Sequence, residues 1–199
     1  YPDQKFMSVD FVPMEDTDGD GEGDSQFDNV AGYTFKEHEG SFLVGQLAGA
    51  LTGQDFLGGG GQTMSGSSTV GFVGGVESDL IRKFEAGFTA GVYHANDAVE
   101  VLTNYVGDFN DPAGGKEAAI AMYNNGADIV YHASGNTGTG VFQAAQEQGR
   151  FAIGVDRDQS VTKDSYANVI LASMVKRVDT AVYNAIESVV NDNFQGGSV

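Results

Sequence analysis

The sequence predicts an α/β protein in which parallel strands are covered by helices on both faces. Apolar runs typical of strands alternate with runs of helical spacing along most of the 199 residues, and the connections are short. The run TVGFVG at residues 69–74 contains no charged residue, as is typical of a buried strand in a parallel sheet. Hydrophobic residues make up 41% of the chain, which is enough to form a packed core.

The individual elements follow from the spacing of the apolar residues. Helices are expected at residues 39–51, 79–92, 115–125, 138–148 and 178–190. Strands are expected at residues 5–11, 29–35, 69–74, 99–106, 127–132, 151–155 and 168–174, the first of them short and buried. Ligands of parallel sheets bind at the carboxyl ends of the strands. A site is therefore expected in the turns at residues 74–79, 107–111, 133–140, 156–159 and 175–177.

The chain is strongly acidic. It has 10 Lys and Arg residues against 28 Asp and Glu residues, for a net charge of −18. Such a surface repels phosphate backbones, so nucleic acid is disfavoured as a partner. Two interpretations remain: a cationic ligand or partner, or a halophilic protein whose carboxylates keep it soluble in concentrated salt. The acidic residues are spread along the chain, which favours the halophilic interpretation.

The chain contains no cysteine, so disulfides, thiolate nucleophiles and cysteine-bound metals are excluded. No apolar run reaches the ~20 residues needed to cross a bilayer. The first residues lead directly into a strand-like run without a signal peptide, so we expect the true start of the protein to lie upstream.

One acidic, glycine-rich segment resembles the opening of a calcium-binding loop. Its alternating aspartates, Asp16, Asp18 and Asp20, are followed by Gly21, which is the order found in an EF-hand. The twelfth position is Phe27 instead of a bidentate glutamate, and no pair of helices flanks the segment. An acidic surface loop is therefore favoured over a calcium site, and no metal ligand is assigned.

Five sequence blocks occur in the same order as in one known family. They are FKEHEGSFL at residues 35–43, VGFVGG at residues 70–75, NYVGDFNDPA at residues 104–113, GVDRDQ at residues 154–159 and SMVKRVD at residues 173–179. With these blocks the chain resembles the basic-membrane-lipoprotein family, the purine nucleoside receptors of ABC importers. Each block is a weak signal alone, whereas five in order over almost the whole chain are a strong one.

The resemblance implies a type I periplasmic-binding-protein fold, with two Rossmann-like lobes of parallel sheet and the ligand in the cleft between them. Residues 1–36 and 175–199 would belong to the first lobe, and residues 37–174 would form the second. The family has further residues before a point like Tyr1, with an Asp-Asp-Lys-Ser-Phe-Asn type of motif, and a C-terminal strand region. Both are absent here, so the first lobe is expected to be incomplete in this chain.

The resemblance also implies a function. The chain is expected to bind a purine nucleoside for an ABC importer, with permease subunits as partners and no cofactor or catalytic residue. A lipid anchor outside this chain would hold it at the extracellular face of the cell membrane. Two alternatives stay open: a hydrolase or phosphorylase acting on nucleosides, and the ligand-sensing domain of a transcription regulator. The sequence has no Gly-x-Ser-x-Gly motif and no complete phosphate loop.

A nucleoside has a flat base, polar base edges and a ribose diol, so its site needs an aromatic platform, carboxylates and backbone donors. Phe142 resembles the family phenylalanine that stacks on the base, and its alternative is a core aromatic residue. Gly138 and Gly140 either let the backbone approach the ligand or serve only a turn. The three histidines lack metal spacing and are expected to be structural: His38, His94 and His132.

Three aspartates follow predicted strands. Asp156 ends a strand, and its carboxylate can accept hydrogen bonds from both hydroxyls of a ribose diol. Asp158 is the weaker candidate, with a solvated turn acid as its alternative. Asp111 directly precedes Pro112, so it either caps a helix or accepts a hydrogen bond from the purine edge.

Two further residues complete the candidate site. Phe109 either lines the cleft or closes the end of a strand. Lys176 resembles the family lysine near the ribose, and an ion pair with Asp179 three residues later is its alternative.

Overall fold

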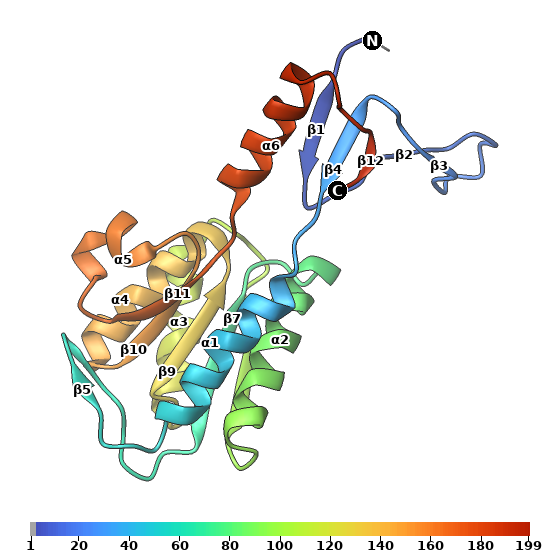
Figure 1. Cartoon of the computed structure of the whole chain (residues 1–199). Helices are drawn as coiled ribbons and strands as arrows, with labels where there is room; N and C mark the ends of the chain where they lie inside the picture. Colours follow the sequence, from blue (N-terminus) through green and yellow to red (C-terminus); the bar gives the residue numbers. More distant parts are fainter. Residues whose placement is uncertain (1–2) are drawn as a thin grey trace. The chain divides into compact units, whose positions relative to one another are not determined.

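The computed structural model describes residues 3–199 (Figure 1). Contacts divide the chain into two compact units. The larger unit is Glu37–Lys176, and the smaller unit combines the segments up to Lys36 and from Arg177 onward. Within residues 3–199, no helix is long and apolar enough to span a bilayer.

The larger unit contains a sheet of five parallel strands. In spatial order they are β11 (Ile170–Val175), β10 (Phe151–Asp156), β9 (Ile129–Ala133), β7 (Thr69–Gly74) and β8 (Glu100–Tyr105). Because all five strands run in the same direction, their carboxyl ends form one edge of the sheet. The turns that follow these strands are therefore neighbours in space.

Helices cover both faces of this sheet. The helices α1 (Glu37–Leu51) and α2 (Asp79–Ala95) pack against each other on one face (Figure 1), and α3 (Pro112–Asn124) and α4 (Gly138–Gln148) pack against each other on the other. Successive side chains of each strand point to opposite faces of the sheet, so the core consists of two clusters, one on each face. Phe72 belongs to the cluster under α1 and α2, whereas its neighbour Val73 belongs to the cluster under α3 and α4.

Glycines allow α1 and α2 to approach closely. A Cβ atom on Gly45 would collide with the carbonyl group of Phe88, and one on Gly91 would collide with that of Phe42. The two helices therefore pack backbone against backbone, and larger residues at these positions would force them apart.

From residue 3 onward, the smaller unit has a three-stranded parallel sheet and one helix. The sheet order is β1 (Phe6–Val9), β4 (Val30–Tyr33) and β12 (Gly197–Ser198), and the helix is α6 (Val178–Val190). A hairpin of β2 (Met14–Glu15) and β3 (Ser25–Gln26) extends between β1 and β4 in the sequence.

The predicted elements are largely confirmed. The strand at residues 69–74 and the helices at residues 138–148 and 178–190 have the predicted bounds. The prediction that the first strand is buried is wrong: Phe6 is 44% exposed, because β1 is an edge strand of a small sheet. Several short elements are not predicted by the sequence: the β2–β3 hairpin, the pair β5 (Leu57–Gly58) and β6 (Gly61–Gln62), the helix α5 (Gln159–Thr162) and β12.

Candidate functional site

The candidate site lies at the carboxyl edge of the five-stranded sheet in the larger unit. The structure places four groups of the predicted residues there. Phe109 and Asp111 follow β8, Gly138 and Gly140 begin α4 after β9, Asp156 ends β10, and Lys176 follows β11. The structure therefore places these residues at the edge of the sheet where ligands of parallel sheets bind, and their contact with a ligand stays a prediction.

The turns after β8 and β9 are joined by Thr137, a fully buried residue in the 3₁₀ turn before α4. Its hydroxyl donates to the carbonyl of Asp108 at 2.8 Å and accepts from the backbone N–H of Asp111 at 2.8 Å. Its own N–H donates to the carbonyl of Phe109 at 3.1 Å. Thr137 lies in the turn after β9 and makes all three bonds to the turn after β8. These bonds hold residues 108–111 in a fixed position against the start of α4.

Asp111 caps helix α3. Its Oδ1 atom accepts a hydrogen bond from the N–H of Gly114 at 3.0 Å, and Pro112 occupies the first turn. This is the capping alternative, and it is confirmed. A ligand contact by Asp111 stays a prediction.

Phe109 offers apolar surface at this edge of the sheet. It is 42% exposed, and its ring packs on the backbone of Gly75, where a Cβ atom would collide with the ring. The exposed side chains next to it are polar and linked: Asn136 donates to Asn110 at 2.8 Å and accepts from Thr139 at 3.1 Å. An aromatic face beside amide and hydroxyl groups is the mixture that small polar ligands with a flat ring require.

Phe142 lies in the core. It is 0% exposed and packs under α4, with its ring 5.0 Å from that of His132 and 6.2 Å from that of Tyr166. No ligand can stack on this ring in the described conformation. We therefore correct the expectation for Phe142 in favour of the core alternative, because the residue falls on the sheet-facing side of α4.

The glycines Gly138 and Gly140 are explained by packing inside the protein. A Cβ atom on Gly138 would collide with the ring of His132, and one on Gly140 would collide with the carbonyl of Pro112 in α3. Both residues are buried. Their smallness serves the contacts of α4 with β9 and α3, so the approach of a ligand is not needed to account for them.

Asp156 has an unusual backbone conformation. Its φ is 67°, in the left-handed region that non-glycine residues rarely adopt. The N–H of Arg157 donates to the carbonyl of Val155 at 2.8 Å, which makes Asp156 the centre of a tight three-residue γ-turn. Its carbonyl accepts from the N–H of Lys176 at 2.9 Å, and the residue is exposed. Strain of this kind is concentrated at functional sites.

Asp158 caps the short helix α5. Its Oδ1 atom accepts hydrogen bonds from the N–H of Ser160 at 3.0 Å and from the Ser160 hydroxyl at 2.6 Å. The residue is exposed, which agrees with the alternative of a solvated turn acid. In addition, its carboxylate stabilises the turn by accepting the two hydrogen bonds from Ser160.

Lys176 is buried in an ion pair. It is 9% exposed, and its Nζ atom lies 3.2 Å from Oε1 of Glu37, which is 2% exposed. The ammonium group also lies 5.8 Å from the ring centre of Phe84. The alternative of a pair with Asp179 is wrong, because Arg177 binds that carboxylate through two hydrogen bonds of 2.9 and 3.0 Å. Glu37 and Lys176 are the terminal residues of the larger unit, so their pair joins its two ends.

His132 is structural, as predicted. It is fully buried, with Nε2 2.9 Å from Oε1 of Gln159 and Nδ1 3.2 Å from the hydroxyl of Ser134. Burial lowers the pKa of its imidazole to about 4. The ring is therefore neutral near pH 7. An amide oxygen can only accept, so Nε2 carries the proton and Nδ1 accepts from Ser134.

We expect His132 to make the free energy of unfolding fall as the pH drops from about 6.5 to about 4. The folded protein keeps the imidazole neutral in this window, whereas the unfolded chain protonates it near its ordinary pKa of 6.5. The contribution is about 3 kcal/mol, present in full above the unfolded pKa and lost below the folded pKa. Urea titrations at neutral pH and inside this window measure the loss. In His132→Gln the loss should shrink by that amount, and an unchanged pH dependence would contradict the assignment.

Comparison with known proteins decides the family. All of residues 1–199 match the family model Bmp, described as ABC transporter substrate-binding protein PnrA-like. The chain belongs to the Bmp family. The CD4+ T-cell-stimulating antigen of Listeria monocytogenes is 39% identical over 184 residues, which cover 86% of this chain and 48% of that protein. The ABC transporter nucleoside-binding protein BmpA of Lactococcus lactis is 34% identical over 185 residues, which cover 86% and 49%.

Solved structures agree with the predicted type I periplasmic-binding fold. An ABC transporter solute-binding protein from Aeropyrum pernix K1 has a TM-score of 0.78 and 32% identity, covering 100% of this chain and 51% of its own. A transcriptional activator of the comK gene from Bacillus halodurans has a TM-score of 0.75 at 23% identity, which shows a shared fold alone. The Bmp-family chain thus spans about half the length of the curated relatives that it matches.

Three residues of the candidate site were not predicted from the sequence: Thr137, Gln159 and Glu37. Thr137 lies in a turn whose glycines drew attention instead. Gln159 ends the block GVDRDQ, and Glu37 lies in the block FKEHEGSFL, so both were quoted without a role. A polar residue next to a fully apolar strand in the sequence indicates that its side chain is buried and hydrogen-bonded. Its hydrogen-bond partner, however, is identified only by the three-dimensional structure.

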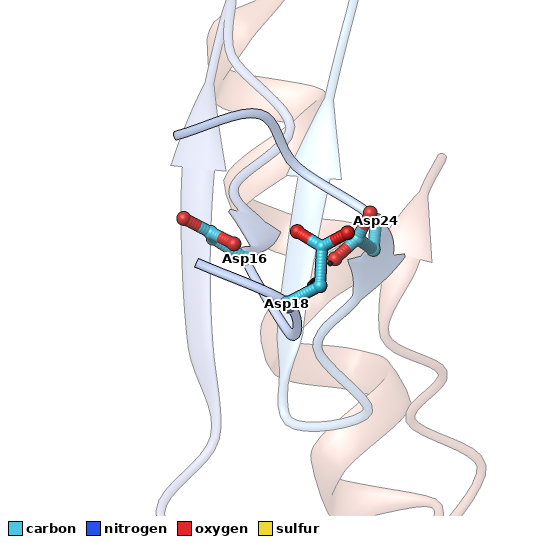
Figure 2. Close-up of side chains that lie close together, drawn as sticks. All are labelled: Asp16, Asp18 and Asp24. Atoms are coloured by element: carbon cyan, nitrogen blue, oxygen red, sulfur yellow. Dashed lines mark hydrogen bonds between the residues drawn. The ribbon is translucent and has the colours of Figure 1, made fainter. Parts of the chain in front are cut away.

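The acidic segment of the smaller unit is the tip of the β2–β3 hairpin. Asp16, Asp18 and Asp24 lie close together there (Figure 2). One carboxylate oxygen of each lies within 4.8 Å of those of the other two. Asp20 is not in this group, so the EF-hand order is not reproduced. Asp24 accepts from the hydroxyl and the N–H of Thr17 at 2.6 and 2.8 Å, which lowers the pKa of Asp24. The three carboxylates are exposed and accept hydrogen bonds from backbone N–H groups of their own loop, as expected for an acidic surface loop.

Proposed function

We propose that the protein binds a purine nucleoside at the carboxyl edge of this sheet and delivers it to an ABC importer. The observation that carries the proposal is Asp156, an exposed carboxylate on a strained turn at the end of β10. A carboxylate can accept hydrogen bonds from both hydroxyls of a ribose. Membership of a family of ABC substrate-binding proteins, one relative of which is named a nucleoside-binding protein, supports the same class of ligand.

In this proposal the remaining edge residues bind the base. Phe109 supplies an exposed aromatic face, and Asp111, Asn136 and Asn110 supply acceptors and donors for the base edge. Lys176 contributes positive charge beside the ribose, although in the described conformation its Nζ atom is bound to Glu37. Phe142, Gly138 and Gly140 support the site from inside, and Asp158 holds the turn after Asp156.

The larger unit acts as one lobe of a clamp, and the smaller unit is part of a second lobe. The smaller unit has exposed apolar side chains on β1 and α6, including Phe6, Ile186 and Val190. Such a surface is typical of an element that packs against further polypeptide. Because the chain spans about half the length of its relatives, we infer that the whole protein completes this lobe.

The protein acts without catalysis, at the extracellular face of the cell membrane, where a lipid anchor outside this chain holds it beside its permease. The names of relatives in this family, such as Basic membrane protein A of Borreliella burgdorferi, support a location at a membrane. Incubation of the whole protein with inosine tests the first point. Release of free hypoxanthine would show an enzyme and would overturn the binding proposal.

Replacing Asp156 should separate binding from stability. In Asp156→Gly we expect the Kd for inosine to rise about 10- to 100-fold, because charge-assisted hydrogen bonds to the ribose are lost. The same change removes the strain at φ 67°, so thermal stability should not fall. Calorimetric titration and thermal unfolding of the whole protein measure the two effects.

Asp97→Ala is the control, since Asp97 is an exposed acid in the turn between α2 and β8, at the opposite edge of the sheet. It should leave the Kd unchanged. An unchanged Kd in Asp156→Gly would remove Asp156 from the site.

A further inference from the structure

A buried chain of hydrogen bonds lies directly beneath the Asp156 turn. Oε1 of Gln159 accepts from the N–H of Val155 at 2.7 Å and from Nε2 of His132 at 2.9 Å. The N–H of Gln159 donates to the hydroxyl of Ser173 at 3.1 Å, and Ser134 bonds the other nitrogen of His132. Gln159 thus connects the carboxyl ends of β9 and β10 through its side-chain amide oxygen, and it binds β11 through its backbone N–H.

The neighbouring residues make room for this chain. A Cβ atom on Gly154 would lie 2.6 Å from the Ser173 hydroxyl and 2.7 Å from Oε1 of Gln159. The ring of His132 likewise occupies the space where Gly138 would carry a side chain. Burying these polar groups is costly unless every one is bonded, and an apolar core would avoid that cost. A purely structural role is therefore a weak reason for their presence.

What the chain of bonds fixes is the strained turn. A non-glycine residue with a positive φ at the centre of a γ-turn, as in Asp156, persists only when its surroundings over-determine its conformation. Gln159 binds the N–H of Val155, the residue before Asp156, and the N–H of Lys176 binds the carbonyl of Asp156 itself. The amide oxygen of Gln159 is in turn held by the Nε2–H of His132. Both sides of Asp156 are thus tied to neighbouring strands.

We infer that Gln159, oriented by His132, is a positioning residue that holds Asp156 in the strained conformation that presents its carboxylate to the ligand. Neither Gln159 nor His132 contacts the ligand, because Gln159 is buried and His132 is fully buried. The inference rests on the proposed nucleoside site, and it adds a residue that determines affinity from outside that site.

The test is Gln159→Leu in the whole protein. Leucine fills similar volume but accepts no hydrogen bond, so we expect the turn to relax and the Kd for inosine to rise about tenfold. Two spectroscopic signatures should accompany the loss. The backbone amide shifts of Asp156 and Arg157 should move, and the ¹H–¹⁵N spectrum of His132 should lose the Nε2–H tautomer that Gln159 selects. Gln159→Glu keeps an acceptor oxygen at the same place and should keep the Kd near that of the unchanged protein.

Gln146→Leu is the matched control, because this glutamine is an exposed residue of α4 bonded to the carbonyl of Ser165. It should change neither the Kd nor the His132 spectrum. Unchanged Kd and unchanged Asp156 amide shifts in a folded Gln159→Leu protein overturn the inference. If Gln159→Leu does not fold, Gln159→Met, whose side chain offers no oxygen to Val155 or His132, is judged by the same two measurements.

A failure of the proposed function can be distinguished from a failure of the positioning inference. If the unchanged protein binds no inosine, the nucleoside proposal falls. The positioning inference is then decided by the amide shifts of Asp156 and Arg157 alone: movement in Gln159→Leu supports it, and no movement overturns it.

Discussion

Phe142→Ala should lower the free energy of unfolding by about 3–5 kcal/mol. The ring is 0% exposed and packs against His132 and Tyr166 within the cluster between α4 and the sheet. Alanine leaves a cavity that this environment cannot fill, because the backbone of α4 is already in contact with α3 at Gly140. Urea denaturation followed by circular dichroism measures the loss.

Phe109→Ala is the matched control, since Phe109 is 42% exposed and its removal opens no cavity inside the core. It should cost little stability and should weaken nucleoside binding instead. The opposite outcome, a stable Phe142→Ala protein with weakened binding, would restore Phe142 as a ligand contact and would refute its assignment to the core.

Phe109 and Phe142 show which features of the structure can be predicted from the sequence and which cannot. The alternation of strand-like and helical runs located the sheet, because buried parallel strands such as β7 carry an apolar pattern that few other elements share. The same pattern predicted that Phe109, Asp111 and Asp156 lie at one edge of the sheet, because the carboxyl ends of parallel strands lie at the same edge. The prediction that Phe142 stacks on a base rests on its resemblance to the family phenylalanine, and this resemblance does not show which face of α4 packs against the sheet.

Interactions between distant segments could not be predicted. Glu37 and Lys176 are 139 positions apart in the sequence and meet only because α1 and β11 are in contact in the fold. The local rule of three to four residues suggested Asp179 instead, where Arg177 is the actual partner. Likewise, Gln159 and His132 are 27 positions apart in the sequence, and their bond depends on the neighbouring position of β9 and β10.

Lys176→Met should cost about 3–5 kcal/mol of unfolding free energy, because it leaves the carboxylate of Glu37 buried without its counter-ion. Glu37 is 2% exposed, and within residues 3–199 its carboxylate oxygens have no hydrogen-bond partner besides the ion pair with Lys176. The ammonium group of Lys176, 3.2 Å away, is therefore the main compensation for this buried charge. Chemical denaturation of the variant measures the loss.

Lys116→Met makes the same substitution in a surface pair with Glu147, where water screens both charges, and it should have only a small effect. The double variant Glu37→Leu with Lys176→Met removes both charges, so most of the lost stability should return. A coupling near zero in this double-mutant cycle would show that the two side chains act independently. A large coupling together with unchanged inosine affinity in the double variant would give Lys176 a structural role alone. A lost affinity in a fully stable double variant would instead place the ammonium group in contact with the ribose, as the proposed site requires.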